Sequence, residues 1–324
     1  MKDLAKLLCI AVLGAMVAWG QEPQSGPAAA NKALQAGQAD RAMAMLGSLP
    51  PGQAGSAEAH NLRCRVLFTL EQFDAATDEC QQAVNLDWRN SDYHMWLGRS
   101  LGEKADKASF IMAYGLAKRA RAELEKAVEL DPRNAEALAD LGEFYNSAPG
   151  VVGGGTAKAQ GVAAQLDRVD PARAHELRAF IAEDNHDYGT TERELKQAIA
   201  LSRNPAFQWM RLASFYRRTK QWTQMDNAVQ SGFVAAERDR HSAVALFNGA
   251  SVLMKANRNP ALAIKMLEAY LASSGQTEEA PAFVAHIWLA RLRAQSGDKA
   301  AAQRERQAAL ELANGYKPAQ DLKF

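Results

Sequence analysis

Hydrophobic positions in this 324-residue chain recur every three or four residues over most of its length, as they do on one face of an α-helix. Almost no segment alternates apolar and polar residues with the period of two that a half-buried strand shows. We therefore predict an all-α protein with roughly 70–80% of its residues in helix, well above the usual third. Turn residues, of which Gly37, Asp187 and Gly315 are examples, separate one helical segment from the next.

The helical segments fall into units of similar length. Pro132 and Pro171 lie 39 positions apart, and Pro171 and Pro205 lie 34 apart. Gly or Ala stands where the two helices of a unit would cross, so the helices can approach closely and bulkier apolar side chains fill the gaps between turns. A single helix hairpin leaves one apolar face uncovered, and successive units must therefore stack on one another.

Several units carry the spacing of a known repeat. Leu141, Gly142 and Tyr145 have the pattern L-G-x2-Y, and Trp209 and Leu212 have the pattern W-x2-L. This layout resembles the tetratricopeptide repeat (TPR), a helix–turn–helix unit of about 34 residues. The resemblance covers residues 29–314 and implies an α-solenoid of about seven or eight stacked antiparallel helix pairs in a right-handed superhelix. Residues 315–324 are then a C-terminal tail.

Two units are longer than the repeat. Residues 104–116 supply most of an insert of about ten residues, which we expect to lengthen the helices of that unit. In residues 147–155, Pro149 is expected to end one helix, the glycines to permit a turn, and Thr156 to cap the next helix. The sequence Pro-Gly-x2-Gly-Gly-Gly in this insert resembles that of exported, uncharacterised bacterial TPR proteins, a resemblance that implies no particular activity.

A phosphate-binding loop is a competing interpretation of residues 147–155. Gly150 and Gly155 have the outer spacing of that motif, but Thr156 stands where its lysine belongs, and the preceding segment is helical rather than a strand. We favour a helix connector or a loop that contacts a partner. Asp131 and Asp170, each followed by proline, are expected to cap the helices that follow them.

Residues 1–20 have the plan of a secretory signal peptide. Leu7–Trp19 is apolar almost throughout, and with 13 residues it is shorter than the roughly 20 that span a bilayer. Leu8 stands where a small residue would precede Cys9 in a lipoprotein, which argues against that alternative. We expect cleavage after Gly20, a disordered start over residues 21–28, and a periplasmic or extracellular location.

Charge gives no sign of a nucleic-acid or membrane partner. The chain has 38 Lys and Arg residues against 37 Asp and Glu residues, and loss of the signal peptide would leave no net charge. No global field then attracts polyanions. Outside the expected signal peptide, no apolar run in the sequence is long enough to cross a bilayer.

Loss of the signal peptide would leave two cysteines, Cys64 and Cys80. In the repeat that the sequence resembles, their positions face one another across the two helices of one unit. A disulfide, which needs an oxidising compartment, would close a loop of about 15 residues and contribute roughly 3 kcal/mol in the loop-entropy account. Two buried thiols that act as small apolar side chains are the alternative.

No catalytic or metal-binding constellation is recognisable in the sequence. None of the six histidines has the spacing of H-E-x2-H or of a zinc site. No G-x-S-x-G elbow occurs, and the polar cluster Asp184–Asp187 is too short for a calcium loop. We therefore predict no enzymatic activity and no cofactor.

The remaining functional surface is the concave face of the solenoid. The resemblance places the second, fifth, ninth, twelfth and thirteenth residues of each first helix on that face. These positions offer apolar contacts and arginines able to bind a carboxylate bidentately. The candidate partner-contact residues are Asn61, Arg65, Phe68, Met95, Arg99, Glu143, Asn146, Met210 and Arg217.

Three functions remain open. The leading hypothesis is a non-enzymatic scaffold of the bacterial cell envelope that holds a peptide or protein in the concave groove. The second is a periplasmic small-ligand binder of a transport assembly, with Phe110–Leu116 closing one end of a pocket. The third is a structural module that self-assembles through its terminal helices.

Overall fold

The computed structural model describes residues 26–239 and 242–324. Helix accounts for 78% of these residues, and no strand occurs among them. The predicted all-α class and helix content are therefore confirmed. The expected signal peptide (residues 1–20) and most of the expected disordered start lie outside the described residues.

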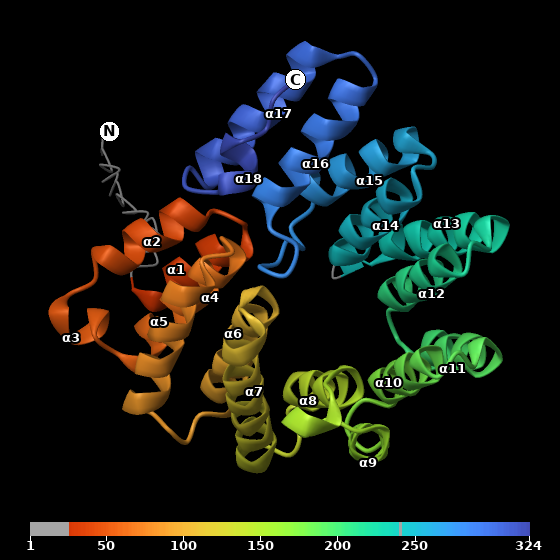
Figure 1. Cartoon of the computed structure of the whole chain (residues 1–324). Helices are drawn as coiled ribbons and strands as arrows, with labels where there is room; N and C mark the ends of the chain where they lie inside the picture. The colour runs from red at the N-terminus through yellow and green to blue at the C-terminus, as the bar shows by residue number, and fades with distance from the viewer. Residues whose placement is uncertain (1–25, 240–241) are drawn as a thin grey trace, which may run out of the picture.

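The helices of the described ranges form eight successive pairs, each joined by a short turn (Figure 1). The first four pairs are α1 (Pro27–Gln35) with α2 (Ala39–Gly47), α4 (Ala57–Thr69) with α5 (Phe73–Leu86), α6 (Ser91–Lys107) with α7 (Phe110–Leu130), and α8 (Ala135–Ser147) with α9 (Thr156–Leu166). The other four are α10 (Pro171–Asp184) with α11 (Tyr188–Leu201), α12 (Ala206–Arg218) with α13 (Trp222–Arg238), α14 (Ala243–Ala256) with α15 (Pro260–Ala272), and α16 (Ala282–Gln295) with α17 (Lys299–Leu312). The short helices are α3 (Pro51–Ala54), η1 (Gly150–Val152) and α18 (Lys317–Gln320).

Side-chain caps fix where several helices begin. The carboxylate of Asp170 accepts a hydrogen bond from the backbone N–H of Arg173 (3.1 Å), which confirms its predicted role at the start of α10. Asp131 does not cap α8: it accepts from the N–H of Arg133 within the turn, and Asn134 is the residue that caps the helix. The reason is the length of the turn, which places Asn134 directly before the first helical residue.

Small residues lie at the helix crossings, as the sequence pattern predicts. A Cβ added to Gly142 would overlap the side chain of Leu177, and one added to Gly98 would lie 2.8 Å from the side chain of Leu124. Gly142 thus lets α8 approach α10, and Gly98 lets α6 approach α7. Because the interior is close-packed, these positions cannot take a larger residue without displacing a neighbouring helix.

The two inserts differ in structure. The first lengthens a hairpin, since α6 and α7 have 17 and 21 residues whereas α4 and α5 have 13 and 14. The second is the predicted helix connector, closed by a hydrogen bond from the N–H of Gly155 to the carbonyl of Tyr145 (2.7 Å). Thr156 is the first residue of α9 and Gly155 occupies the cap position without a side-chain bond, so the expectation that Thr156 caps this helix is wrong.

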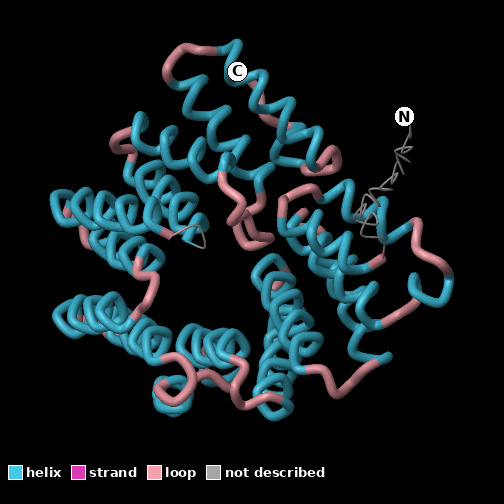
Figure 2. The backbone as a smooth tube through the Cα atoms, turned by 180° about the vertical axis from the view of Figure 1, so that it is seen from behind, coloured by secondary structure: helices cyan, strands magenta, loops and turns pink. Residues whose placement is uncertain are grey.

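The two ends of the solenoid meet, so the helix pairs form a closed ring. In Figures 1 and 2, α1 and α2 lie beside α16, α17 and α18, with α8 to α13 on the far side of the ring. One apolar cluster joins Leu34 and Leu46 to Phe283 and Tyr316. We call this junction the seam: the contacts of α1, α2, α4 and Glu71, in the turn after α4, with residues 273–324. The sequence pattern gives no sign of it.

Hydrogen bonds across the seam join residues far apart in the sequence. The N–H of Asn314 donates to the carboxylate of Asp40 (2.7 Å), and the hydroxyl of Tyr316 donates to the carboxylate of Glu71 (2.7 Å). Burial and the hydrogen bond to Glu71 both raise the pKa of Tyr316, so this hydroxyl stays protonated over the physiological range.

Candidate functional site

The loop between α15 and α16, residues 273–281, projects into the middle of the ring, as Figures 1 and 2 show. Tyr270 braces it: its buried hydroxyl donates to the carbonyl of Ala280 (2.5 Å) and accepts from the N–H of Thr277 (3.2 Å). Burial raises the pKa of Tyr270 to about 12. The last turns of α15 therefore hold the loop through these two hydrogen bonds.

Glu278 fixes this loop to the N-terminal part of the ring. Its carboxylate accepts hydrogen bonds from Nε of Arg65 (2.9 Å) and from Nε2 of Gln35 (2.9 Å), and Nη2 of Arg65 also contacts it. The Glu278 side chain is 8% exposed and that of Arg65 is 17% exposed. The pair is thus largely shielded from solvent. The guanidinium of Arg65 already donates its hydrogen bonds to a carboxylate of its own chain.

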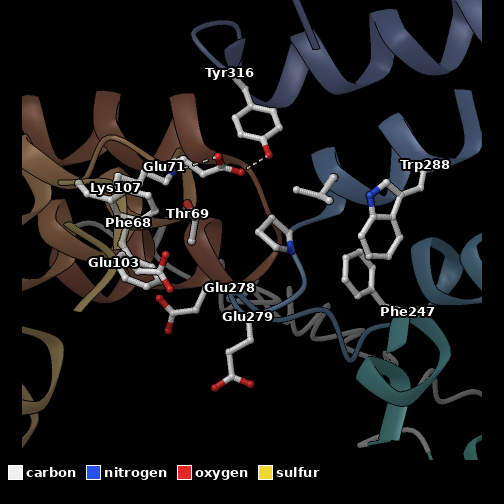
Figure 3. Close-up of a pocket in the computed structure, with 13 residues that line it drawn as sticks. Phe68, Thr69, Glu71, Glu103, Lys107, Phe247, Glu278, Glu279, Trp288 and Tyr316 are labelled. Carbon is white, nitrogen blue, oxygen red and sulfur yellow. Dashed lines mark hydrogen bonds and ion pairs between the residues drawn. The ribbon is translucent and has the colours of Figure 1, made fainter. Parts of the chain in front are cut away.

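Two pockets open beside the loop. The smaller, about 490 Å³, lies between the loop and the ends of α4 and α16 and is drawn in Figure 3. The larger, about 620 Å³, we call the central pocket; it is formed by α4, α6, α7, α8 and the loop. Phe68, Glu103, Glu278 and Glu279 line both pockets.

Carboxylates outnumber cations in the central pocket. Of its six carboxylates, Asp140 pairs with Arg99 (2.5 Å) and Glu278 pairs with Arg65. The central pocket therefore carries negative charge beyond what its arginines neutralise. The other four lining carboxylates are Glu103, Asp106, Glu143 and Glu279.

Three of these carboxylates have no ion-pair or hydrogen-bond partner within the described part of the chain: Glu103, Asp106 and Glu279. Figure 3 shows Glu279 pointing away from the other labelled side chains. Burial, and then the nearby Glu136, raise the pKa of Glu279; burial, and then Asp106, raise that of Glu103. A cation bound beside either carboxylate would offset its burial and the repulsion from the neighbouring acid.

Aromatic side chains form the apolar wall of the central pocket. Phe68 packs edge-to-face on Trp96 with 5.5 Å between ring centroids, and Phe144 lines the pocket with them. The guanidinium of Arg99 lies 4.7 Å from the Trp96 ring and that of Arg65 lies 5.5 Å from it. Rings and carboxylates side by side make a surface suited to a cationic group on an aliphatic stem.

The predicted partner-contact residues do not form one surface. Arg65, Phe68, Arg99 and Glu143 come together at the central pocket and its border with the seam. Asn146 lies on the same helix as Glu143, and its amide donates to Asp184. Arg217 is half-buried on α12 and lines neither pocket.

Three of the predicted contact residues are in the interior, which corrects the sequence analysis. Met95 is 3% exposed, Met210 is 2% exposed and Asn61 is 5% exposed. Met210 fills the space left by two glycines, since a Cβ added to Gly232 or Gly249 would lie within 3 Å of it. A partner cannot reach these side chains while the helices keep their positions.

Cys64 and Cys80 form a disulfide between α4 and α5 in the structure, with Cα atoms 5.1 Å apart. That separation lies within the range that disulfides span. Both cysteines are fully buried, next to the hydroxyl of Ser100.

Histidine–glutamate pairs are a feature that the sequence analysis missed. In four helix pairs a histidine of the first helix contacts a glutamate of the second through Nδ1, at 2.6 to 2.7 Å. The recurring separation of 19 residues in three of them is a signal that the sequence does contain. The pairs are His60–Glu79, His94–Glu123, His175–Glu194 and His286–Glu305.

Residues 26–239 and 242–324 contain no candidate metal site and no candidate membrane span. No group of three or more His, Cys, Asp or Glu side chains there could hold a metal ion. None of the helices in these ranges has both the length and the apolar character of a bilayer-spanning segment.

No protein-family model matches the sequence, and no curated protein matches it. The crystal structure of the APC/C hetero-tetramer Cut9-Hcn1 matches with 15% sequence identity and a TM-score of 0.39, over 87% of this chain and 57% of that chain. TTC0263, a thermophilic TPR protein of Thermus thermophilus, matches with 20% identity and a TM-score of 0.44, over 61% of this chain and 100% of that chain.

This chain thus spans less than two thirds of the first of these structures. At such TM-scores neither structure says what this chain binds. Its own helix pairs, their stacking and the glycines at their crossings make it a TPR-like α-solenoid.

Proposed function

We propose that this chain is a non-enzymatic interaction scaffold of the bacterial cell envelope that holds a basic segment of a protein partner in the central pocket. The observation that carries the proposal is an aromatic wall beside Glu103, Asp106 and Glu279, which make no ion pair or hydrogen bond with another described residue. A lysine or arginine side chain would pair with these carboxylates and lie against Phe68 or Phe144, which line the central pocket and are only partly buried. The partner is thus expected to present a cationic residue at the end of an extended or helical segment.

The location in the envelope is supported by two features. The first 20 residues have the plan of a signal peptide, and the Cys64–Cys80 disulfide belongs to an oxidising compartment. Measurement of the intact mass after alkylation, with and without reductant, tests the second feature. Two alkylated thiols in freshly isolated, unreduced protein would argue against export.

Site-specific photo-cross-linking in living cells tests partner binding. A photo-reactive residue at Ser147, which is exposed and lines the central pocket, should form adducts with a protein partner. The same residue at Ala300, exposed on α17, is the matched control and should form none. Adducts from neither position, or equally from both, would contradict the proposal.

Charge variants sharpen this test. Glu103→Gln combined with Glu279→Gln should weaken partner binding by about tenfold or more, because both carboxylates line the central pocket. Glu311→Gln, on the exposed side of α17, removes a carboxylate away from the pocket and should leave binding unchanged.

A small-ligand binder is the second candidate, and the closed ring favours it. Pockets of about 490 and 620 Å³ fall within the usual range for small-molecule sites, roughly 300–1,000 Å³. A cationic small molecule in native mass spectra of gently purified protein, lost in the Glu103→Gln, Glu279→Gln variant, would establish this alternative. Self-assembly through the terminal helices is not proposed, since these helices bind one another across the seam.

A further inference from the structure

The turn between α6 and α7 carries an exposed apolar patch, which we call the α7 tip: Phe110, Ile111, Met112 and Tyr114. Phe110 and Ile111, at 90% and 85% exposed, are the two most exposed large apolar side chains of the described residues. The corresponding turns of other pairs are polar, as in residues 185–187 (Asn-His-Asp) and 257–259 (Asn-Arg-Asn). The stacking of helix pairs therefore does not account for the α7 tip.

The α7 tip lies in the middle of the ring, beside the central pocket. The end of α6, just before the tip, lines this pocket with Glu103 and Asp106, and the loop 273–281 lines it with Glu278 and Glu279. Figures 1 and 2 show the end of the hairpin next to this loop inside the ring. A single segment of chain can enter this space more readily than a folded domain or a flat surface can.

One side of the α7 tip continues the wall of the central pocket. Ala117 and Leu124 of α7 line the pocket. Phe110 precedes Ala117 by seven residues, which is close to two full turns, so the two residues share a face of the helix. Tyr114 follows Phe110 by about one turn and lies on the same face, whereas Met112 lies on the opposite face. The apolar lining thus extends for about 10 Å along α7, from Ala117 to Phe110.

Unpaired carboxylates lie next to this apolar face. Glu103, Asp106 and Glu279 line the central pocket and make no ion pair or hydrogen bond with another described residue. The cations of α6 do not neutralise them, because those cations lie beside other acids. The Lys104 Nζ is 2.7 Å from a carboxylate oxygen of Asp74, and the Nζ of the last residue of α6 is 3.7 Å from one of Glu71.

The cations of α7 neutralise these carboxylates only in small part. Arg119 follows Phe110 by two and a half turns and lies on the opposite side of the helix, where it donates to the side chain of Gln81 (3.0 Å). The Nζ of Lys118 is 5.3 Å from the ring centroid of Tyr114. Among the lysines and arginines of residues 104–121, Lys118 alone lies near this face without an acid partner. Three unpaired carboxylates outnumber it, so a ligand of complementary charge is cationic.

We propose that the central pocket and the α7 tip together bind one amphipathic segment of a protein partner. A lysine or arginine of this segment pairs with one of the unpaired carboxylates, and a large apolar side chain near it in sequence covers Phe110 and Tyr114. An extended segment rises about 3.3 Å per residue, so about three residues span the distance from Ala117 to Phe110. This inference rests on the proposed function, to which it adds the apolar part of the recognition.

Binding of two labelled peptides, measured by fluorescence anisotropy, tests this inference. Both are decapeptides of glycine and serine with an arginine near each end. The first has two central leucines, each three residues from one of the arginines, and the second has serines in their place. The parent protein should bind the leucine peptide about tenfold or more tightly than the serine peptide, because a large apolar side chain is removed from water. Phe110→Ser combined with Tyr114→Ser should bind both peptides equally.

Met112→Ser is the matched control. Met112 is 59% exposed and lies on the side of the same tip that points away from the pocket, so this variant should keep the preference for leucine. Since the substituted side chains are all exposed, thermal unfolding of the variants should match that of the parent.

Equal binding of the two peptides by the parent protein would overturn the inference and leave the proposed function standing, since that function requires only the cationic residue. Binding of neither peptide would count against both. A preference for leucine that persists in the Phe110→Ser, Tyr114→Ser variant, or that is lost in Met112→Ser, would overturn the inference alone. A dimer in light scattering that the Phe110→Ser, Tyr114→Ser variant abolishes, without any preference for leucine, would show that a second copy covers the tip and would also overturn it.

Discussion

Neighbouring helix pairs contact one another in a different way from the two ends of the chain, which meet at the seam. Between α10 and α14 the contacts are mainly apolar, with Phe215 and Met225 fully buried and with glycine or alanine at the crossings. At the seam an apolar cluster is combined with polar contacts between specific residues, such as Gln35 with Glu278. The stacking of neighbouring pairs therefore follows from a sequence pattern that each repeat contains. Closure of the ring depends instead on individual residues at the seam that belong to no repeating pattern.

Loss of an aromatic side chain at the seam should have the largest effect. Phe283→Ala removes a ring that is 1% exposed and packs edge-to-face on Tyr316 at 4.8 Å. We expect a loss of about 3–5 kcal/mol in the free energy of unfolding and an increase in the radius of gyration measured by small-angle X-ray scattering.

Phe215→Ala is the matched variant away from the seam, since Phe215 is fully buried between neighbouring pairs. It should destabilise by a similar amount, about 3–5 kcal/mol, without expanding the folded protein. Equal radii of gyration for the two variants would mean that Phe283 does not hold the ring closed.

A larger residue at a helix crossing away from the seam should have the next largest effect on stability. Gly142→Leu should lower the free energy of unfolding by about 1–3 kcal/mol, because a Cβ at this position already overlaps Leu177. Gly161→Leu is the control, since nothing lies within 4 Å of an added Cβ there. Thermal unfolding would contradict the assigned packing if the Gly142 variant melted at the parent's temperature.

Loss of the ion pair between Arg99 and Asp140 should have the third largest effect on stability. An arginine in an open groove, as the sequence predicts for Arg99, would contribute little to stability. In the structure burial raises the pKa of Asp140 and Arg99 opposes that rise. Arg99→Ala should therefore cost about 1–2 kcal/mol in chemical denaturation, and adding Asp140→Asn should recover part of the loss. No recovery would show that Arg99 acts through its contact with Trp96 instead.

The smallest effect concerns pH. Burial alone would lower the pKa of His94, but its hydrogen bonds to Glu123 and to the carbonyl of Trp88 outweigh burial and raise it above the usual 6.5. Both ring nitrogens have acceptors as partners, which favours the doubly protonated ring. Since the folded-state pKa is raised, this stabilisation is fully present below pH 6.5 and is lost as the pH rises through the folded-state value.

The pH dependence of unfolding checks this prediction. The free energy of unfolding should fall more between pH 6.5 and pH 8, about the range in which histidine titrates, for the parent than for His94→Gln. Identical slopes would mean that folding does not raise the pKa of His94.

The sequence predicts the helices, their pairing and their crossings because these depend on neighbours in the repeat. Gly142 and Asp170 could be placed from local spacing alone. The seam could not, because Gln35 and Glu278 are 243 positions apart and no periodic pattern relates them. The candidate site was predicted in part. Arg65, Phe68 and Arg99 line it or border it, and Glu103, the thirteenth residue of its helix, also falls on the concave-face pattern. Glu279 lines it only because the ring closes around residues 273–281.

The distance between the two ends of the solenoid tests closure of the ring most directly. Spin labels on cysteines introduced at Ala44 of α2 and Glu311 of α17, both exposed, allow it to be measured by pulsed electron resonance with the Cys64–Cys80 disulfide intact. We predict a single narrow distance distribution at the separation seen in the structure, and a broader distribution at longer distances in Phe283→Ala. A broad, long distribution in the parent protein would show an open superhelix and would contradict the closed ring.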